Sequence, residues 1–312
     1  MKNMNGGCNR GPRYTLHFEL GTRTHTPGIA ALARIAMACL TIILPVYNEA
    51  WLIGSVMTRI IEHAEAHPQR HILIVDDGST DRTPQLVTER LNRVDHDRIT
   101  LLRHERNQGK AEAIITGLRH SKDPLVCYTD GDLAYSLDHV DQLQEALQDA
   151  DVAIGSRALA GASQRNISLH RRLFGETFNL LVRMILGIPH RDTQAGLKGF
   201  TFEAATRLFS RLKTRNFAFD AELLYLARKE RMRVVEIPAH VSARHSYKVS
   251  TMNMFRDPLT MLWSVCRVRL QHAGRTASDP NTIVESKADS ARVDHEAIVS
   301  SSVTTASKEP IS

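Results

Sequence analysis

Between residues 40 and 156 the sequence alternates short apolar runs with longer segments in which apolar residues recur every three or four positions. The apolar runs predict five strands, at Leu40–Pro45, His71–Val75, Ile99–Leu102, Leu125–Thr129 and Asp151–Gly155. The intervening segments predict helices at Ala50–Ala66, Thr83–Asn92, Gly109–His120 and Leu137–Leu147, the second of them capped by Ser79, Thr80 or Asp81. Such alternation with short connections limits this half to an α/β fold, a mostly parallel central sheet flanked by helices.

The sequence after residue 156 is less regular. It predicts strands from Gly199 and at Val234–Ile237, with helices at Leu169–Leu186, Phe202–Leu212, Ala218–Arg231 and Met252–Leu270. Residues 1–38 show no clear period, and residues 273–312 are polar with few large apolar side chains, which is typical of disorder. We therefore expect one folded domain at 39–272, built from halves at 39–156 and 157–272, between a poorly ordered extension and a disordered tail.

The net charge of +6 is unevenly distributed along the chain. Residues 40–156 carry 11 Lys and Arg against 19 Asp and Glu, a net of −8, whereas residues 157–272 carry 20 against 8, a net of +12. Two solvated surfaces would explain this asymmetry, and so would a basic half that faces an anionic partner such as phosphate or a membrane surface. Nucleic acid is excluded as a partner because the basic residues are not interleaved with aromatic ones and the acidic half would have no role.

Polar side chains follow three of the predicted strands. Tyr47-Asn48-Glu49, Asp76-Asp77 and Asp130-Gly131-Asp132 each stand where an apolar run ends. Ligands of open parallel sheets bind beyond the carboxyl ends of the strands, so these groups are expected to converge on one crevice. Two carboxylates separated by one small residue form a compact set of hard oxygens, which suits Mg²⁺ or Mn²⁺ that also binds substrate phosphates.

The order of the motifs carries a resemblance to a known family. They are Pro45-Val46-Tyr47-Asn48-Glu49, Val75-Asp76-Asp77-Gly78-Ser79, Asn107-Gln108-Gly109-Lys110, Asp130-Gly131-Asp132, Gly155-Ser156-Arg157, the run from Arg191 to Phe200, and the run from Phe217 to Leu224. Over residues 40–270 the chain resembles the family 2 glycosyltransferases. Within them it is most similar to the polyprenyl-phosphate sugar transferases of the dolichyl-phosphate β-glucosyltransferase branch. Each motif alone is weak, but seven in fixed order are specific.

The resemblance implies a nucleotide-diphospho-sugar transferase (GT-A-like) fold and an inverting transfer reaction. A hexose, with glucose from UDP-glucose expected, would move from the nucleotide-diphospho-sugar donor to a polyprenyl or dolichyl phosphate acceptor. Mg²⁺ or Mn²⁺ would be the cofactor. The alternatives are a soluble sugar or phosphorylated small molecule as acceptor, and a mannosyl donor in place of a glucosyl one.

The resemblance also assigns the donor side of the site. Its donor-binding residues are Pro45, Tyr47, Glu49, Asp76, Asp77, Lys110 and Asp130, with Asp130 and Asp132 as metal ligands. Tyr47 would pack on the base or be half-buried structure, and Glu49 would bond the ribose or complement a helix dipole. Asp76 and Asp77 would bond the base or ribose, or form a turn with capping acids. Lys110, at a predicted helix N-terminus, would bind an anion or be a solvated lysine.

On the acceptor side, a lipid phosphate is already an anion and needs cations to align it more than a base to deprotonate it. Arg157, Arg165, Arg171 and Arg172 supply such cations. By resemblance Asp192 lies at the reacting sugar, as a base or as a holder of sugar hydroxyls and of a nearby cation. Asp132, Asp192 and Arg157 are the expected catalytic residues, and further substrate contacts are assigned to Gln194, Lys198, Asp220 and Glu222, one of the last two being alternatively a helix cap.

The expected location is the cytoplasmic face of a membrane, with peripheral attachment. No run approaches the roughly 18 uninterrupted apolar residues of a membrane span, although the dolichyl-phosphate glucosyltransferases carry an N-terminal membrane helix. Met252–Leu270 places an apolar stripe beside Arg256, Arg267 and Arg269, so it would lie in the bilayer interface or pack on the core. The four cysteines show no paired spacing, so no zinc site or disulfide framework is indicated, and a reducing compartment fits best.

Overall fold

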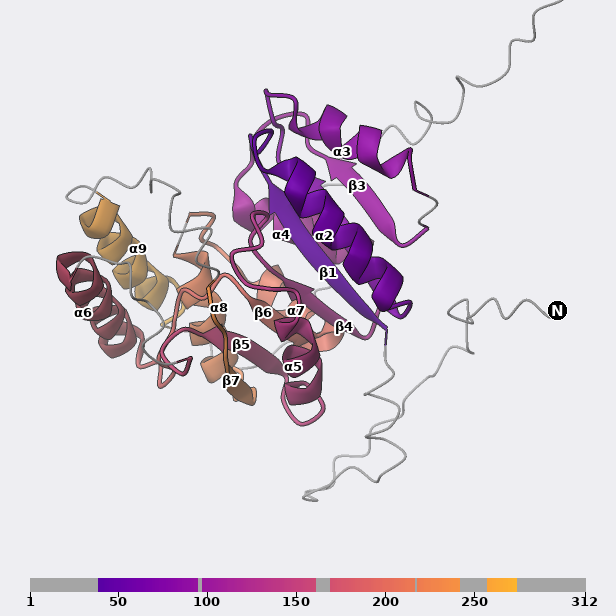
Figure 1. The fold of residues 1–312 in the computed structure, drawn as a ribbon. Coiled ribbons are helices and arrows are strands. Elements are labelled where there is room, and N and C mark those ends of the chain that lie inside the picture. The colour runs from indigo at the N-terminus through magenta and orange to yellow at the C-terminus, as the bar shows by residue number, and fades with distance from the viewer. Residues whose placement is uncertain (1–38, 95–96, 161–168, 217, 242–256, 274–312) are drawn as a thin grey trace, which may run out of the picture. The chain divides into compact units, whose positions relative to one another are not determined.

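A computed structural model describes residues 39–94, 97–160, 169–216, 218–241 and 257–273. Within them a seven-stranded sheet runs in the order β3-β2-β1-β4-β6-β5-β7 (Figure 1). The strands are β1 Leu40–Val46, β2 Arg70–Asp76, β3 Ile99–Arg103, β4 Leu125–Tyr128, β5 Val152–Ser156, β6 Lys198–Thr201 and β7 Val234–Pro238. All pairings are parallel except those of β6. The predicted α/β fold with a mostly parallel sheet is confirmed.

Helices fill the intervals between the strands, as predicted. They are α2 Ile53–Ala66, α3 Thr83–Leu91, α4 Lys110–His120, α5 His139–Ala146, α6 Leu169–Leu186, α7 Phe202–Ser210, α8 Phe219–Lys229 and α9 Asp257–Gln271. The predicted extension at 1–38, the tail from 274 onward and the first five residues of the predicted helix from Met252 lie outside the described residues.

The start of α2 and the cap of α3 differ from the prediction. The helix expected from Ala50 begins at Ile53, and the N–H groups of Glu49 and Ala50 donate to Thr83 Oγ1 and Asp81 Oδ2. The N-cap position of α3 is Arg82 and not Ser79, Thr80 or Asp81, although Asp81 still accepts a hydrogen bond from the Thr83 N–H.

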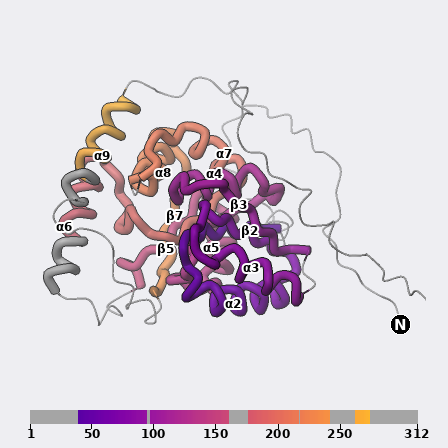
Figure 2. Tube along the Cα trace, turned by 90° about the horizontal axis from the view of Figure 1, so that it is seen from above, coloured from indigo at the N-terminus to yellow at the C-terminus, as the bar shows by residue number. Residues whose placement is uncertain are grey.

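Each face of the sheet is buried under its own layer of helices. The strands alternate: Ile43 of β1 packs in one apolar cluster with residues of α4, α7 and α8, while Ile42 and Leu44 pack in the other with residues of α2 and α5. This is the period of two expected of a strand that is covered on both sides. Figure 2 shows α2 and α3 on one side of the sheet and α4, α7 and α8 on the other.

The antiparallel strand β6 positions the site. It lies between β4 and β5, with Lys198 opposite Tyr128 and Gly199 opposite Cys127. Because β6 runs against its neighbours, its first residue stands at the edge where the parallel strands end. The loop that leads into β6 therefore meets the turn that leaves β4. This pairing brings the 191–197 segment of the basic half to the Asp130 turn of the acidic half.

The two helices α6 and α9 pack together on the β5–β7 side of the fold (Figure 1). Val182 and Leu186 of α6 and Val265 and Val268 of α9 are buried in the same apolar cluster. The buried side of α9 thus packs on the protein's own core, which was one of the two expectations for this segment. Among the described helices, none has both the length and the apolar character needed to cross a bilayer.

Two of the cysteines are free. Cys127 is buried in β4 and Cys266 is partly exposed in α9. Isolated cysteines that are widely spaced carry no pairing signature in a sequence, so the expectation that no disulfide framework is indicated stays a prediction.

Candidate active site

The loops after β1 and β2 are joined by hydrogen bonds. Asn48 donates from its N–H to Ser79 Oγ at 2.9 Å, and its side-chain oxygen accepts from the Thr80 N–H at 2.9 Å. Asn48 has a φ of 52°, a left-handed conformation that Asn tolerates better than most residues. Glu49 precedes α2 by several residues and its N–H donates to Thr83 Oγ1 at 2.8 Å, so it is not the first-turn acid that one reading of the sequence expected.

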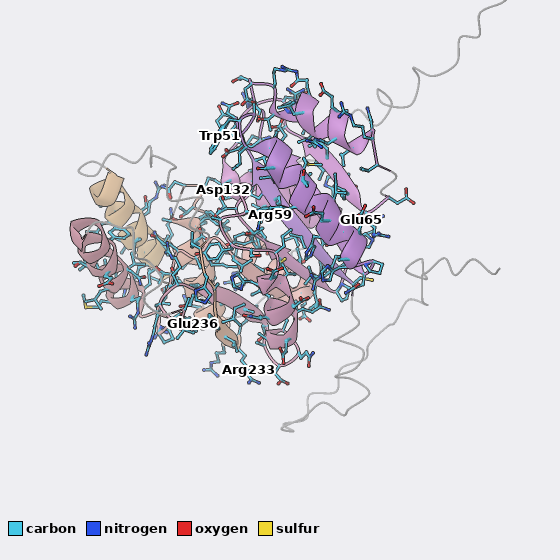
Figure 3. The ribbon with its side chains drawn as sticks, viewed as in Figure 1. Trp51, Arg59, Glu65, Asp132, Arg233 and Glu236 are labelled. Carbon is cyan, nitrogen blue, oxygen red and sulfur yellow. The ribbon has the colours of Figure 1, made fainter. Side chains whose placement is uncertain are left out.

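Two aromatic side chains stand exposed on this joined pair of loops. Tyr47 is 43% exposed and Trp51 is 70% exposed. Figure 3 shows Trp51 and Asp132 on the side where α2 begins, while Glu65 lies toward the other end of α2. An exposed tryptophan was not among the predicted site residues, since one tryptophan in a helical pattern is indistinguishable from core. A contact of Tyr47 with a nucleotide base stays a prediction.

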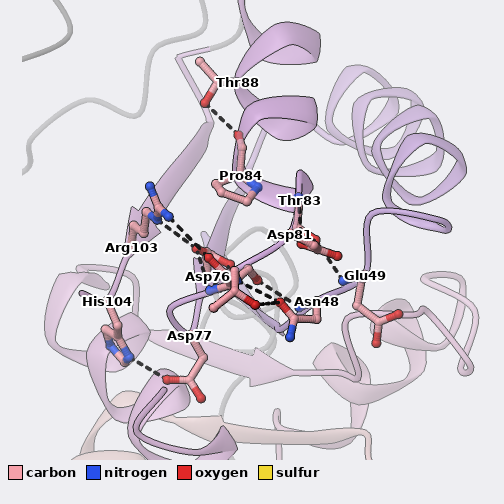
Figure 4. A network of polar contacts seen from close by, with 12 residues as sticks. Asn48, Glu49, Asp76, Asp77, Asp81, Thr83, Pro84, Thr88, Arg103 and His104 are labelled. Atoms are coloured by element: carbon pink, nitrogen blue, oxygen red, sulfur yellow. Dashed lines mark hydrogen bonds and ion pairs between the residues drawn. The ribbon is translucent and has the colours of Figure 1, made fainter. Parts of the chain in front are cut away.

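Asp76 and Asp77 are buried and hydrogen-bonded, as Figure 4 shows. Asp76 accepts from Arg103 Nε at 3.2 Å and from the Ser79 N–H at 3.3 Å. Asp77 accepts from the N–H groups of Gln108 and Gly109 at 2.9 and 2.8 Å and from His104 Nδ1 at 2.8 Å. Their contacts are those of acids that stabilise a turn, which was the alternative expectation. A contact of either carboxylate with a base or ribose stays a prediction.

The Asp130–Asp132 turn is packed closely against β1. A Cβ at Gly131 would collide with the carbonyl oxygen of Pro45, so only glycine fits between the two carboxylates. Asp132 Oδ1 accepts from the Ala134 N–H at 3.0 Å, and Lys110 Nζ donates to Asp130 Oδ1 at 2.5 Å. Lys110 is thus not a solvated lysine, because its ammonium is paired with Asp130.

The donor set of this turn fits Mg²⁺ or Mn²⁺. The Asp130 side chain is 35% exposed and Asp132 is partly exposed, so solvent reaches both residues in the turn that follows β4. Such ions are commonly bound by one or two carboxylates together with substrate phosphates. Over the described residues no three His, Cys, Asp or Glu side chains lie close enough to form a complete protein cage. Oxygen atoms of water and of a substrate would therefore complete the coordination shell.

Arg157 and Asp192 form a bidentate ion pair between the ends of β5 and the loop before β6. Arg157 Nε and Nη2 donate to Asp192 at 2.7 and 3.0 Å, and the Arg157 N–H donates at 3.2 Å. Burial alone would raise the pKa of the Asp192 carboxyl, but the hydrogen bonds and charge of Arg157 outweigh it and hold that pKa below its usual range. Asp192 is therefore ionised and a weak base.

Two residues that the sequence did not single out hold Asp192 in place. Glu236 Oε1 of β7 accepts from the N–H groups of Arg191 and Asp192 at 2.9 and 3.2 Å. Asn179 of α6 accepts from Thr193 Oγ1 at 2.8 Å and donates to the Arg191 carbonyl. No short motif contains either residue, since each is more than ten positions from the loop that it holds. Gln194 lies in the same loop and donates its N–H to Asp192 Oδ1 at 3.3 Å.

Lys198 and Asp220 are placed beneath the crevice and not on it. Lys198 is fully buried, and its Nζ donates to Asp220 Oδ1 and to the Ala195 carbonyl, each at 2.5 Å. Tyr128 donates its hydroxyl to Asp220 Oδ1 at 2.6 Å. The structure corrects the predicted substrate contact of Lys198: with no exposed surface, its ammonium instead holds the loop that packs on Asp130.

Glu222 also differs from its predicted role. It is fully buried and accepts from the N–H groups of Lys213 and Thr214 at 2.9 and 2.8 Å and from His272 Nε2 at 2.7 Å. It therefore ties the loop before α8 to the end of α9 and does not line a sugar pocket. Asp220 and Glu222 both lie within α8, so neither is its N-cap. Two residues apart on a helix, they point to different sides.

The remaining predicted residues are placed less fully. Arg171 and Arg172 lie within α6, but their side chains are outside the described part of the structure, as is the whole of Arg165. Pro45 is in β1, opposite Val75 of β2. Taken together, the described geometry brings Tyr47, Lys110, Asp130, Asp132, Arg157 and Asp192 to one edge of the sheet.

Comparison with known proteins decides the family. A sequence profile of glycosyl transferase family 2 matches residues 41–209, more than half of the chain. This chain belongs to glycosyl transferase family 2. The match begins in β1 and ends in α7, so it includes the Asp76–Asp77 loop, the Asp130–Asp132 turn and the Arg157–Asp192 pair.

Within family 2 the chain is similar to dolichyl-phosphate β-glucosyltransferases and to a polyprenol monophosphomannose synthase. The chain is 31% identical over 235 residues to a dolichyl-phosphate β-glucosyltransferase of Trichomonas vaginalis, which covers 71% of this chain and 69% of that protein. It is 32% identical to the human dolichyl-phosphate β-glucosyltransferase over 64% of this chain and 65% of that protein. A polyprenol monophosphomannose synthase of Mycolicibacterium smegmatis is 31% identical over 65% of this chain and 77% of its own length. The chain thus spans about two-thirds of the glucosyltransferases that it matches.

Solved structures show the same fold. Glucosyl-3-phosphoglycerate synthase of Mycobacterium tuberculosis, crystallised with Mn²⁺, UDP and phosphoglyceric acid, matches with a TM-score of 0.53 at 18% identity, covering 82% of this chain and 86% of that one. The GT-A-like fold that the sequence predicted is confirmed for this family 2 chain, and at this identity the likeness concerns the fold alone.

Proposed function

We propose that this chain is an inverting hexosyltransferase that transfers glucose from UDP-glucose to a polyprenyl or dolichyl phosphate. The observation that carries the proposal is the Arg157–Asp192 pair at the crevice edge. A hydroxyl acceptor needs a general base whose pKa lies near the working pH, and Arg157 lowers the pKa of Asp192 instead. A phosphate acceptor is already ionised and needs no such base. The named relatives that act on dolichyl phosphate support the same choice.

Some residues of this site would bind the donor and others would bind the acceptor. Tyr47 would pack against the nucleotide base, and Asp130 and Asp132 would hold a divalent ion next to the diphosphate. Such an ion supplies Lewis-acid stabilisation of the charge on a leaving diphosphate. Arg157 is 42% exposed despite its pairing with Asp192, so its guanidinium has surface left to bind the acceptor phosphate. Asp192 keeps that guanidinium fixed, and Arg171 and Arg172 are proposed as further phosphate contacts.

The test of the proposal is a transfer assay on lipid and soluble acceptors. The full chain is incubated with Mn²⁺, UDP-[¹⁴C]glucose and detergent-dispersed undecaprenyl phosphate, and label is counted in the organic and aqueous phases. Label in the organic phase, with a β-linked product by NMR, is expected. Label only in water-soluble products would support the alternative of a soluble acceptor, and an α-linked lipid product would contradict inversion.

The identity of the sugar is tested in parallel. The same reaction with GDP-mannose serves because one relative is a polyprenol monophosphomannose synthase. We expect glucose to be transferred at a kcat/KM at least about tenfold above that of mannose, a discrimination of the size that a few hydrogen bonds to sugar hydroxyls supply. A preference for GDP-mannose would keep the reaction class and change the donor.

We further propose that α6 and α9 carry the membrane-binding surface on the cytoplasmic face. Five of the exposed large apolar side chains lie on these two helices: Leu180, Leu181, Met184, Trp263 and Leu270. Arg267 of α9 is exposed beside them and suits anionic lipid headgroups. An apolar face flanked by arginine is the composition of helices that lie in the bilayer interface.

Flotation with vesicles of phosphatidylcholine and phosphatidylglycerol tests this surface. The substitution Trp263→Ser is expected to lower the bound fraction of the full chain about tenfold, because tryptophan anchors at the interface. Trp51→Ser is the matched control, since Trp51 is 70% exposed against 68% for Trp263 but lies on the β1–α2 loop. Equal loss in both variants would contradict a surface confined to α6 and α9.

A further inference from the structure

The ion pair between Lys110 and Asp130 occupies the carboxylate that is proposed to bind the divalent ion. Lys110 Nζ lies 2.5 Å from Asp130 Oδ1. The other oxygen, Oδ2, is packed against Gly196, where a Cβ would collide with it. One oxygen of Asp130 is therefore paired with an ammonium, and the other lies close to the backbone of Gly196. An ion that binds Asp130 competes with Lys110 for the charge of this carboxylate.

The ammonium of Lys110 is held in position by groups other than Asp130. Its Nζ lies 5.7 Å from the ring centre of Tyr128 and 5.9 Å from that of Phe219, distances at which a cation is attracted to an aromatic face. The residue before it, Gly109, has a φ of 95° and donates its N–H to Asp77 at 2.8 Å. The start of α4 is therefore fixed by Asp77. If Asp130 turned to another cation, Lys110 would stay at the crevice.

We propose that Lys110 is the resident counter-cation of Asp130 and that it couples metal binding to donor binding. Without ligands Lys110 neutralises Asp130 and opposes a divalent ion, because the ion must separate an existing ion pair. A diphosphate bound beside the turn offers Lys110 a new anionic partner and frees Asp130. Metal ion and nucleoside diphosphate then bind cooperatively, with Lys110 changing partner between them. The inference rests on the proposed function, since it takes the donor diphosphate as the second ligand.

Such coupling is reciprocal and has a measurable size. If UDP tightens Mn²⁺ binding by some factor, Mn²⁺ tightens UDP binding by the same factor. Coupling between two sites is commonly about 5- to 150-fold. Direct contact between the ion and the diphosphate contributes part of the tightening with or without Lys110. The contribution of Lys110 is the part of the tightening that is lost when its charge is removed by substitution. The expectation concerns binding alone and needs no turnover.

The experiment measures Mn²⁺ affinity of the full chain by the electron paramagnetic resonance signal of free Mn²⁺, with and without UDP. The same titration with inorganic pyrophosphate removes any dependence on the base. In Lys110→Met we expect Mn²⁺ alone to bind about threefold or more tightly than in the wild type. We also expect the tightening of Mn²⁺ by UDP to fall at least about fivefold from its wild-type value, on the scale of a site-to-site coupling.

Two further variants make the result interpretable. Lys122→Met removes the same charge from an exposed position after α4 and should leave the coupling unchanged. Lys110→Arg keeps the charge and should restore most of it, and circular dichroism confirms folding of each variant. Wild-type coupling in Lys110→Met overturns the inference while the donor site stands. The proposed function itself is contradicted if the wild-type chain binds no Mn²⁺ in the presence of UDP. It is also contradicted if the Asp132→Asn variant binds Mn²⁺ with the same affinity as the wild type.

Discussion

The ends of β2 and β4 carry similar pairs of acidic residues that differ in burial and in hydrogen-bond partners. Asp76 and Asp77 are buried, and their oxygens accept from backbone N–H groups, Arg103 and His104. Asp130 and Asp132 are partly exposed, and the ammonium of Lys110 is the partner of Asp130. A carboxylate whose hydrogen bonds go to fixed backbone groups holds a loop. One whose partner is a movable cation can exchange that partner for a ligand.

The largest expected effect is on the exposed pair. Asp132→Asn should lower kcat/KM about 10²- to 10³-fold, because it removes charge that binds an ion at the leaving group. Its melting temperature should stay within about 2 °C of the wild type, since Asn at this position can still accept the hydrogen bond from the Ala134 N–H. Asp138→Asn, an exposed acid of the same segment, is the control. Full activity in Asp132→Asn would remove the distinction between the two pairs.

Substitution in the buried pair is expected to lower the free energy of unfolding. Asp77→Ala leaves two backbone N–H groups and the His104 ring without their acceptor, at a cost of about 3 kcal/mol of unfolding free energy. Urea unfolding followed by circular dichroism measures it. Asp97→Ala, at an exposed position, should change stability by less than about 0.5 kcal/mol. If Asp77→Ala were as stable as the wild type and only donor affinity fell, Asp77 would belong with the ligand-binding acids.

A smaller effect is expected from Glu236, which acts on the site through backbone. Glu236→Ala removes the acceptor of the Arg191 and Asp192 N–H groups, so the Arg157–Asp192 pair loses its fixed position. We expect kcat/KM to fall about tenfold, as for supporting residues around a site. Glu236→Gln keeps an accepting oxygen and should recover most of the rate. Glu203→Ala, on an exposed side chain of α7, should have no effect, and a loss there equal to that of Glu236→Ala would contradict positioning.

The sequence predicted the acidic half better than the basic half for a physical reason. In the acidic half each site residue directly follows a strand, so the period of the apolar residues already locates it. Leu125–Tyr128 is a buried run, and Asp130 comes next. The order of β1, β2 and β4 in the sheet then brings three loops to one edge without any further information. The α/β class and the place of the crevice follow from local pattern alone.

In the basic half, contacts between distant segments decide the roles. Glu236 is more than forty residues from Asp192, and Lys198 was predicted to touch substrate only because it lies in a motif. Whether a motif residue of this segment is exposed depends on the antiparallel pairing of β6 with β4. The short apolar run that predicts a strand from Gly199 does not reveal the direction of that strand. The same holds for Glu222, whose partners in the 213–214 loop and at His272 are assembled by packing.

Asp192 lies between the two extremes, since it is buried like Asp77 but paired with a partly exposed cation like Asp130. Its folded pKa is below the usual value near 4, so it stabilises the fold fully above that value and loses this contribution as the pH falls toward the folded pKa. Because Arg157 is 42% exposed, solvent screening limits the contribution to about 1 kcal/mol.

The smallest predicted effect follows from the lowered pKa of Asp192. The difference in unfolding free energy between the wild type and Asp192→Asn should be constant from pH 7 to about pH 5 and should shrink below pH 4, when the wild-type carboxyl takes up its proton. Urea unfolding at pH 7, 5, 4 and 3 measures it, with the exposed Asp149→Asn as the control. A difference that grows as the pH falls would mean that burial, and not Arg157, decides the charge of Asp192. Asp192 would then be a raised-pKa acid able to serve as a base, which is the property that a hydroxyl acceptor requires and a lipid phosphate does not.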